Sequence, residues 1–583
     1  MKTVDKIKAL CVVVLLGSTM TAQAQETKEK EKENLNREMT LEREYDPTVQ
    51  DASKVNTLPV IKEPEVKKMS IDYATYTVPT DPEKEISILP SGNVMTDIQH
   101  NHRKGYFNFG GGTYLNLNGD LGYHILSTDK DHLNLWFSHR STNGKVKYID
   151  TDLEKIKAKL NDNMGGLNFK HVFEKAILDM GIKYGYSAFN YYGMPIADPV
   201  LSNTFEEQLA GYDRETNQVN QTIQAKIGVE SKEEAPIGYL LDLGYTNFSQ
   251  KYALSKEYDG ATEQTFDVKF DLNARFNGEQ RIGIGGNIEY FNYSLPTANG
   301  EELMEFQNHA EIMLSPYYKV HGDNWKVRLG ANVMFSTGDE SEFMASPNIA
   351  ADVEVADKTQ LYLNAGGKMY SNSLHSLAVI NRYAAPFVEL LPSLNYLDAT
   401  VGLRCGAAPG FWFDIFGGYQ VTNNEVFFIP TYNSMSGAFS RLTTLQADAK
   451  KAFGGVNLKY SYQQLFDINL KGVYNSWSVD DIEEAYGKPE MEITAGITVR
   501  PIQKVSASLD YYLATGRKAY LGEAGGIFDM NNINELNLTG TYTFNDTFGA
   551  YLKLNNVLGQ KYELYYGYPM QSFSAMVGVN INF

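Results

Sequence analysis

The last segment of the chain, residues 572–583, alternates between apolar and polar side chains. One parity is wholly apolar and consists of Phe573, Ala575, Val577, Val579, Ile581 and Phe583. The other parity is small or polar, with Met576 as its one exception, and contains Ser574, Gly578, Asn580 and Asn582. Because successive side chains of a strand point to opposite faces, this pattern predicts an amphipathic β-strand. About twelve residues also suffice for a tilted strand to cross a bilayer.

The same period of two recurs in earlier segments of the chain, at 282–290, 491–499, 505–513 and 536–544. In each of them, aliphatic or aromatic residues alternate mainly with glycine and polar residues. This is the pattern of a barrel wall that faces lipid on one side and water on the other.

Turn residues separate these segments, and short turns alternate with long polar connections. Short turns are predicted at 128–131, 231–236, 277–280, 321–324, 356–359, 501–504 and 545–547. Long connections are predicted near 141–155, 193–215, 296–304, 372–396, 425–440, 480–489, 516–533 and 557–571. The first hairpin, turning at 116–118, is predicted to be the only short connection on the long-loop side. A soluble sandwich, the alternative for one amphipathic strand, has no reason to sort its loops by length.

The predicted fold is therefore all-β, a transmembrane antiparallel up-and-down β-barrel of about 22 strands over residues 105–583. An even number of strands returns both ends of the barrel to the same side of the membrane. Barrels of this kind have short turns on the periplasmic side and longer loops outside. We therefore predict a protein of the cell outer membrane, in contact with outer-membrane lipid, with its C-terminus in the periplasm.

The first 24 residues are predicted to be a secretory signal peptide. Lys2, Lys6 and Lys8 give a positive start, an apolar run follows at 9–17, and Ala22 and Ala24 form a small-residue cleavage site. The apolar run is too short to span a membrane as a helix. One cysteine, Cys405, remains after cleavage, so no intramolecular disulfide is possible.

Residues 25–104 are predicted to be a periplasmic extension. Residues 26–36 are almost wholly charged, and the prolines that follow favour an extended, Pro-rich segment over a helix. This extension could bind a periplasmic or outer-membrane protein through residues 37–90, fold back into the barrel, or serve as a plain spacer. The candidate partner-docking or pore-sealing residues are Tyr45, Asp46, Pro47, Leu58, Pro59, Pro64 and Tyr73.

Composition supports the barrel and excludes one class of partner. The 583 residues include 39 Tyr and 49 Gly, and 43% of the chain is hydrophobic. The mean hydropathy is nevertheless −0.35, as expected when apolar residues occupy alternate positions. The formal net charge of −19 argues against nucleic acid as a partner, because phosphate binding needs a basic face.

Sequence motifs for catalysis or cofactor binding are missing from the chain. It contains no His-Glu-x-x-His, Gly-x-Ser-x-Gly or Cys-x-x-Cys, and no Gly-Lys-Ser/Thr follows the three glycines at 110–112. The histidines at 100, 102, 124, 132 and 139 are expected to lie singly on polar surfaces rather than to bind a metal. The acidic stretch 478–484 lacks the spaced ligands of a calcium loop and is predicted to be a solvated external loop. We predict no enzyme, no catalytic residue and no cofactor.

Two parts of the sequence resemble a known family. Residues 554–562 (Leu-Asn-Asn-Val-Leu-Gly-Gln-Lys-Tyr), residues 567–569 (Gly-Tyr-Pro) and the closing strand resemble the C-terminal end of TonB-dependent receptors. Residues 105–114 and 189–193 resemble barrel strands of receptor-like proteins from Bacteroidota. The resemblance implies that the barrel assembly machinery reads the last strand, with Phe573, Val577, Val579, Ile581 and Phe583 as its C-terminal barrel signal.

One part of that family is not recognisable here. TonB-dependent receptors carry a folded plug before the barrel, whereas only the charged, Pro-rich extension lies between the signal peptide and the first predicted strand. A wide barrel needs something to fill its lumen. The candidates are the segment 25–104, inward-folded loops such as 193–215 or 372–396, or a partner protein.

Two functions remain open from the sequence. The first is an outer-membrane receptor or transport protein of the TonB-dependent receptor-like class that passes an unidentified solute. The second is a structural or assembly subunit of an outer-membrane complex, which docks its partners through the N-terminal extension.

Overall fold

The computed structural model describes residues 103–149, 154–194, 217–232, 235–253, 258–277, 279–338, 341–384, 390–430, 441–521 and 526–583. The predicted signal peptide, its cleavage site at Ala22 and Ala24, and nearly all of the predicted extension lie outside these residues.

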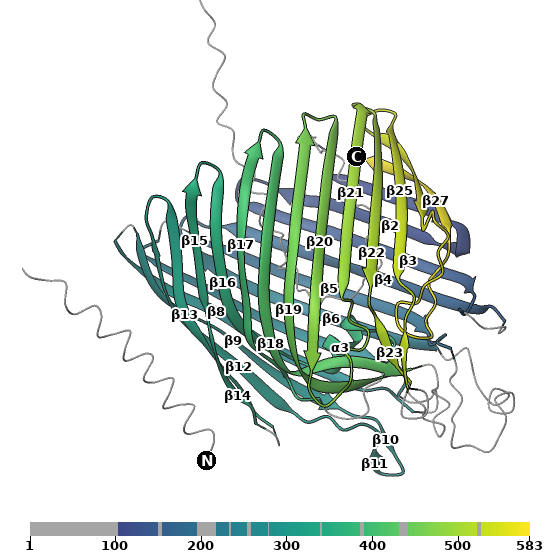
Figure 1. Cartoon of the computed structure of the whole chain (residues 1–583), viewed down its shortest axis with the longest axis horizontal. Helices are drawn as coiled ribbons and strands as arrows, with labels where there is room; N and C mark the ends of the chain where they lie inside the picture. Colours follow the sequence, from purple (N-terminus) through teal and green to yellow (C-terminus); the bar gives the residue numbers. More distant parts are fainter. Residues whose placement is uncertain are drawn as a thin grey trace, which may run out of the picture. The chain divides into compact units, whose positions relative to one another are not determined.

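Antiparallel strands form almost all of the described structure (Figure 1). The first half of the wall contains β1 (Gly105–Gly112), β2 (Leu117–Ser127), β3 (Asp131–Val146), β4 (Ile156–Val172), β5 (Ala176–Asn190), β6 (Asn217–Ser231), β7 (Ile237–Gln250), β8 (Thr262–Asn277), β9 (Gln280–Ser294), β12 (His309–His321) and β13 (Trp325–Ser336). The second half contains β14 (Phe343–Pro347), β15 (Ile349–Ala356), β16 (Thr359–Tyr370), β17 (Ser393–Ala408), β18 (Phe411–Pro430), β19 (Leu442–Tyr462), β20 (Phe466–Val479), β21 (Met491–Ile502), β22 (Val505–Thr515), β25 (Ile533–Thr543), β26 (Phe548–Asn555) and β27 (Ser574–Asn582).

A few short elements lie outside the wall. Two hairpins pair β10 (Thr297–Ala298) with β11 (Glu301–Glu302) and β23 (Lys518–Tyr520) with β24 (Ile527–Asp529). Among the described residues, the helical elements are the 3₁₀ turn η2 (Thr113–Leu115) and the α-helix α3 (Leu374–Ile380). Over the residues that the structure describes, no helix combines the length and the apolar character needed to cross a membrane.

The sheet closes on itself and forms a barrel. Strands that follow one another in sequence pair antiparallel, and β27 pairs with β1 from Tyr106 opposite Asn582 to Gly112 opposite Met576. β14 and β15 both pair with β13 and are separated only by Asn348, so the 23 segments of the sheet form 22 wall strands. The predicted up-and-down, 22-strand, all-β barrel is thereby confirmed.

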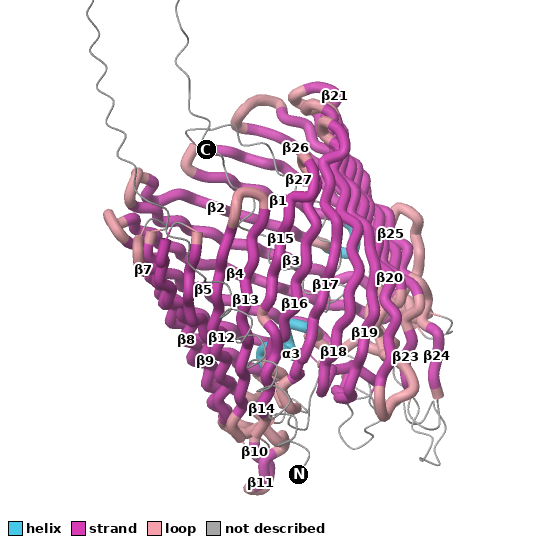
Figure 2. The backbone as a smooth tube through the Cα atoms, turned by 60° about the vertical axis from the view of Figure 1, so that its left-hand side comes forward, coloured by secondary structure: helices cyan, strands magenta, loops and turns pink. Residues whose placement is uncertain are grey.

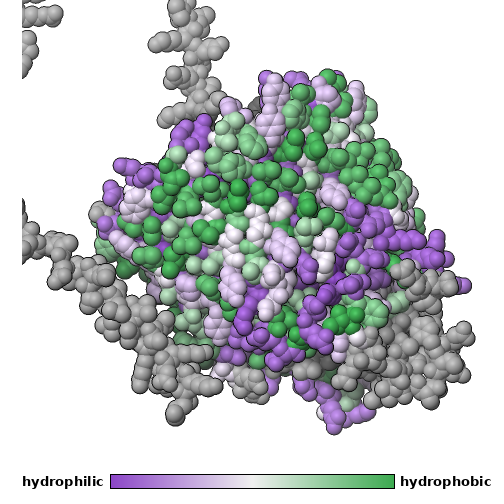
Figure 3. All heavy atoms as spheres, in the orientation of Figure 1, coloured by the Kyte–Doolittle hydropathy of each residue, from purple (hydrophilic) through white to green (hydrophobic). Residues whose placement is uncertain are grey.

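The period-two pattern places apolar side chains on the outer face of the wall. On β9, Ile282 is 49% exposed, and Ile284, Ile288 and Tyr290 are exposed with it. Figure 3 shows apolar residues gathered over the strands on one face of the molecule. A continuous belt of exposed large apolar side chains is stable only in an apolar solvent, so the strands cross a lipid bilayer.

The connections differ in length at the two ends of the barrel, as the sequence predicts. At the short-turn end the connections range from two residues, as at Asp357–Lys358 between β15 and β16, to the five residues 232–236 between β6 and β7. This end also has turns at 173–175, 409–410 and 463–465 that we did not predict. The other end, called the long-loop end below, carries connections such as 295–308, 371–392 and 556–573.

The prediction for the first hairpin is wrong in two respects. The turn lies at 113–116 rather than 116–118, because Tyr114 and Leu115 adopt left-handed backbone angles (φ 58° and 54°) and β2 already begins at Leu117. It is also not the only short connection on its side, since residues 337–342 alone join β13 to β14. Left-handed angles at a tyrosine and a leucine are unusual, so sequence pattern alone does not find this turn.

Candidate functional site

A loop segment crosses the interior of the barrel at the long-loop end. This segment, called the strap below, comprises residues 371–384 and contains α3, which lies inside the ring of strands (Figures 1 and 2). The Ser373 side chain caps the helix by accepting a hydrogen bond from the Ser376 amide at 3.2 Å. Leu374 is 1% exposed and packs in an apolar cluster with Phe248, Ala261, Met304 and Phe306.

The first anchor of the strap is a buried carboxylate on the wall. Glu263 of β8 accepts hydrogen bonds from the Ser373 hydroxyl at 2.9 Å and from the His375 amide at 3.0 Å. A third donor, the Thr265 hydroxyl, lies at 3.1 Å. Hydrogen bonds to an ionised acceptor are stronger than neutral ones, so Glu263 holds the start of α3 firmly against β8.

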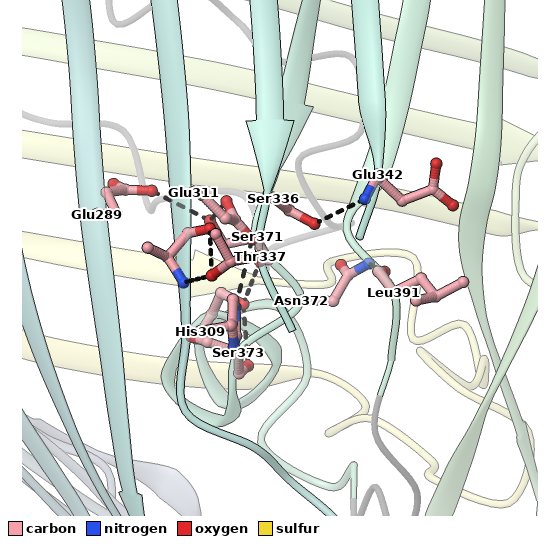
Figure 4. Close-up of polar contacts among 12 residues, drawn as sticks. Glu289, His309, Glu311, Ser336, Thr337, Glu342, Ser371, Asn372, Ser373 and Leu391 are labelled. Carbon is pink, nitrogen blue, oxygen red and sulfur yellow. Dashed lines mark hydrogen bonds and ion pairs between the residues drawn. The ribbon is translucent and has the colours of Figure 1, made fainter. Parts of the chain in front are cut away.

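The next two strands supply a second pair of carboxyl groups. Glu289 of β9 and Glu311 of β12 stand directly opposite each other in the strand register. Both approach the Ser371 hydroxyl, at 3.1 Å from Glu289 and 2.5 Å from Glu311 (Figure 4). His309 lies beside this pair, with its Nε2 atom 3.6 Å from Glu311, and its ring stacks on Phe291.

The other end of the strap is tied to a different part of the wall. Arg382 donates to both carboxylate oxygens of Asp162 on β4, at 3.0 and 3.2 Å, and to the Ser187 hydroxyl on β5 at 3.4 Å. β4 and β5 are separated from β8, β9 and β12 by other wall strands. Only β6 and β7 lie between these two anchor regions, so the strap follows the inner side of the wall from β12 to β4.

Beyond Arg382, the strap enters an aromatic cluster at the mouth of the barrel. Tyr383 stacks on Tyr568 with ring centroids 4.0 Å apart, and the Tyr192 ring contacts both, at 5.6 and 5.1 Å. The Tyr148 hydroxyl donates to the Tyr192 carbonyl at 2.8 Å. Burial raises the pKa of Tyr192 well above its ordinary value, and the neighbouring Tyr383 adds to this shift, so the phenol stays neutral.

This mouth cluster joins opposite sides of the barrel. Besides the tyrosines, the cluster contains buried residues of three wall strands, namely Val146 of β3, Ile156 and Ala158 of β4, and Leu442 of β19. β4 and β19 lie roughly half of the ring apart in the order of strand pairing. Aromatic pairs contribute about 0.5–1.5 kcal/mol each beyond the area that they bury, so these rings hold the loops together over the lumen.

Buried cations make further ties between the long loops. The Arg517 guanidinium donates to the carbonyls of Glu563, Leu564 and Asn531 at 2.7–3.0 Å, which joins the loop 516–532 to the loop 556–573. Burial lowers the pKa of Arg517 to about 10, so it remains charged at neutral pH. Arg441 donates to the Ala253 carbonyl at 2.8 Å.

The imidazole of the strap helix is held in its neutral form. His375 lies with its ring 5.1 Å from Phe248, and burial lowers its pKa to about 4, with a smaller contribution from Lys183. A charged imidazole would have to be desolvated at this position. The strap is therefore most stable when His375 carries no charge.

The predicted barrel-signal residues all lie at the seam where the barrel closes. The Gly105 and Phe583 backbones exchange two hydrogen bonds, at 2.8 and 2.9 Å, and the Phe583 ring packs on Tyr123. Val577, Val579 and Ile581 belong to β27, while Phe573 directly precedes it and is exposed. Their role as an assembly signal stays a prediction.

The remaining predictions concern the extension residues, potential metal ligands and the acidic stretch 478–484. Tyr45, Asp46, Pro47, Leu58, Pro59, Pro64 and Tyr73 lie outside the described residues. Among the residues that are described, no group of three or more potential metal ligands converges. In the acidic stretch, partly exposed Glu484 pairs with Lys518 at 2.5 Å and exposed Asp480 pairs with Lys450 at 3.2 Å.

The strap could be predicted from the sequence only in part. The interval 372–396 was one of several candidates for filling the lumen, and its part up to residue 384 does enter the barrel. The seven-residue helix was not predicted, although Ser373 followed by buried Leu374 and Leu377 is a helix-start signal. Glu263, Glu289 and Glu311 could not be singled out, because each is one polar residue among many on the inner face.

Comparison with known proteins places this barrel among solved structures of receptors and transporters. No family model and no curated protein matches the chain. The FrpB iron transporter from Neisseria meningitidis is similar with a TM-score of 0.62 at 10% identity, over 82% of each chain. The ferric-catecholate import receptor Fiu from K12 E. coli has a TM-score of 0.58 at 9% identity, over 83% of this chain and 82% of that one.

A third similar structure is the ferripyoverdine receptor of the outer membrane of Pseudomonas aeruginosa bound to ferripyoverdine. Its TM-score is 0.59 at 11% identity, over 82% of this chain and 72% of the receptor. At such low identity the likeness shows the fold alone. The receptor-type barrel that the sequence resembles is therefore confirmed as an architecture, and the similar proteins are receptors and transporters rather than enzymes.

Proposed function

We propose that this chain is an outer-membrane receptor or transport protein that passes a small solute through its lumen and is closed at rest by the strap. The observation that carries the proposal is the strap itself, which is fixed to two regions of the wall by a few polar contacts. A barrel with a purely structural role would not need an interior segment, such as the strap, that is held by so few contacts. The similar structures are an iron transporter, a ferric-catecholate import receptor and a ferripyoverdine receptor, and they support transport as the class of activity.

The proposed orientation places the long-loop end outside the cell. The short-turn end, with the extension 25–104 and the C-terminus, then faces the periplasm, where short turns of such barrels lie. In this arrangement a periplasmic or outer-membrane protein would reach the extension through residues 37–90. The strap would be the first barrier that a solute meets from outside.

Solute passage through purified protein in liposomes tests the proposal. Arg382→Ala removes the ion pair between the strap and Asp162, and a two-fold charge-assisted contact of this kind contributes about 1.5–3 kcal/mol. Since 1.4 kcal/mol is a tenfold change in an equilibrium, the open fraction should rise by roughly one to two orders of magnitude. Osmotic swelling in small neutral sugars should accelerate accordingly.

The matched control is Arg140→Ala. Arg140 makes the same kind of ion pair with Asp120 at 2.8 Å, but within the wall, between neighbouring strands β2 and β3. It should leave swelling unchanged. If Arg382→Ala and a variant that also lacks 25–99 both remain impermeable, transport through this lumen is refuted, and the structural or assembly role gains support.

A further inference from the structure

The three glutamates that hold the strap differ in how their hydrogen bonds are satisfied. Glu263 has three donors of its own, as described above. Glu289 and Glu311 instead converge on one hydroxyl, that of Ser371. A serine hydroxyl carries a single proton and can donate to only one of two carboxylates. For the second contact, the 3.1 Å between Ser371 and Glu289, to be a hydrogen bond as well, another proton is needed.

Electrostatics leads to the same requirement. Glu289 and Glu311 are direct cross-strand neighbours, a position in which two like charges are destabilising. Glu311 is 4% exposed, and its Oε1 atom accepts no hydrogen bond. A full negative charge on the buried Glu311 would have one donor, the Ser371 hydroxyl, and the like charge of Glu289 beside it, which is costly in a protein interior.

Among the described groups around the pair, only His309 can meet this need, and only if its ring carries a second proton. Asp267 of β8 adds negative charge near Glu289, and the Asn287 side chain donates to it. On the other side, the His309 Nδ1 atom faces the Gln307 carbonyl at 3.0 Å and must be the donor there. The Nε2 atom that faces Glu311 is then a base in the neutral ring. The strap itself contributes Ser371, while its own imidazole, His375, lies against Phe248.

We infer that Glu289 and Glu311 share one bound proton when the strap is closed, and that loss of this proton releases the strap. Ser371 donates to Glu311 at the shorter distance, and the protonated Glu289 donates to the Ser371 oxygen. The inference rests on the proposed function, because it assigns to the barrel a proton-binding site that regulates its opening. Glu263 has three donors of its own and takes no part in this shared proton.

The direction of the pH effect follows from the proton count. The closed strap binds one proton more than the released strap, so rising pH favours release. Across the range in which the pair titrates, the ratio of released to closed strap should rise about tenfold per pH unit. Glu289→Gln should abolish this dependence, because an amide N–H donates permanently to Ser371 and mimics the protonated acid.

Spin labelling of the strap tests the inference without any solute. Val379 lies on α3 and is 66% exposed, so Val379→Cys accepts a label in a chain whose own Cys405 is changed to Ser. Between pH 6 and 10, we expect the ratio of mobile to immobile label to rise about tenfold per pH unit across the transition. In Glu289→Gln the label should stay immobile at every pH. Asp179→Asn, which also replaces a carboxylate by an amide but lies on β5, should behave as the parent.

The outcomes separate the two proposals. A label that stays immobile in the parent chain at every pH refutes the shared proton, and so does a pH dependence that survives Glu289→Gln. If that dependence vanishes in His309→Gln instead, the imidazole is the switch and the inference is wrong. A pH-sensitive strap in a barrel that passes no sugar would refute the transport proposal while leaving the proton site intact.

Discussion

Removing the buried leucine of the strap helix should release the strap without disturbing the barrel wall. Leu374 is fully buried among Phe248, Ala261, Met304 and Phe306, so Leu374→Ala leaves a cavity in this cluster. Substitutions of this kind cost about 2–5 kcal/mol in well-packed cores. Because a loop relaxes more easily than a core, we expect the lower end, about 2 kcal/mol. At 1.4 kcal/mol per tenfold change, this raises the released fraction by roughly 30-fold.

Hydrogen exchange of the strap amides measures this change. The Leu377 amide donates to the Ser373 carbonyl at 2.9 Å, and the Asn381 amide donates to the Leu377 carbonyl at 2.7 Å. Protection of a peptide that covers these amides should fall by roughly 30-fold in Leu374→Ala. Val379→Ala, an exposed position of the same helix, should change protection by less than about threefold. Equal protection in Leu374→Ala and the parent would refute the claim that apolar packing holds the strap.

Two further predictions concern the imidazole of the strap and the barrel seam. The pKa of His375 is lowered from 6.5 to about 4, so the closed strap binds fewer protons than the released one, and its stability should decline as pH falls from 6.5 towards 4. His375→Gln should remove this loss of stability, which is measured as hydrogen-exchange protection of the strap amides after correction for intrinsic exchange. If protection of the variant falls with decreasing pH as it does in the parent, His375 is not the group that titrates. Gly578→Ala should hinder closure of the barrel, because a Cβ atom there would lie 2.5 Å from the Phe109 carbonyl oxygen of β1 and would collide with the Tyr551 ring, which also lies over Gly110. In gels that separate the closed barrel from the heat-unfolded chain, the fraction of closed barrel should then be smaller than in the parent. Gly540→Ala, which has open space around its Cβ, should give the same fraction as the parent. Equal fractions in the two variants would contradict this packing.

Local periodicity was sufficient to predict the wall. Ile282 and Ile288 face outward and Glu289 faces inward because alternation along a strand fixes the face of each side chain. The sorting of connections by length then indicated a closed meander. Both signals are contained within a few neighbouring residues, so a sequence exposes them directly.

The strap depends on partners that are distant in the chain. Ser373 and Glu263 are 110 positions apart, and Arg382 and Asp162 are 220 apart. No local pattern shows that a polar loop will turn inward, since its serines and arginine would suit a solvated loop equally well. The first hairpin was misplaced for a local reason, the left-handed angles of Tyr114 and Leu115. Predictions for residues 1–102, which include the docking segment and the signal peptide, stay predictions.

The central claim is that the strap closes the lumen, and single-channel conductance in planar bilayers tests it most directly. The mature chain is compared with a variant in which residues 371–384 are replaced by a glycine–serine linker of equal length, and both are also measured without residues 25–99. We predict that the mature chain is silent and that replacing the strap gives a large, steady conductance in at least the shortened form. A parent chain that is already widely open, or a strap replacement that stays silent in both forms, would contradict the account.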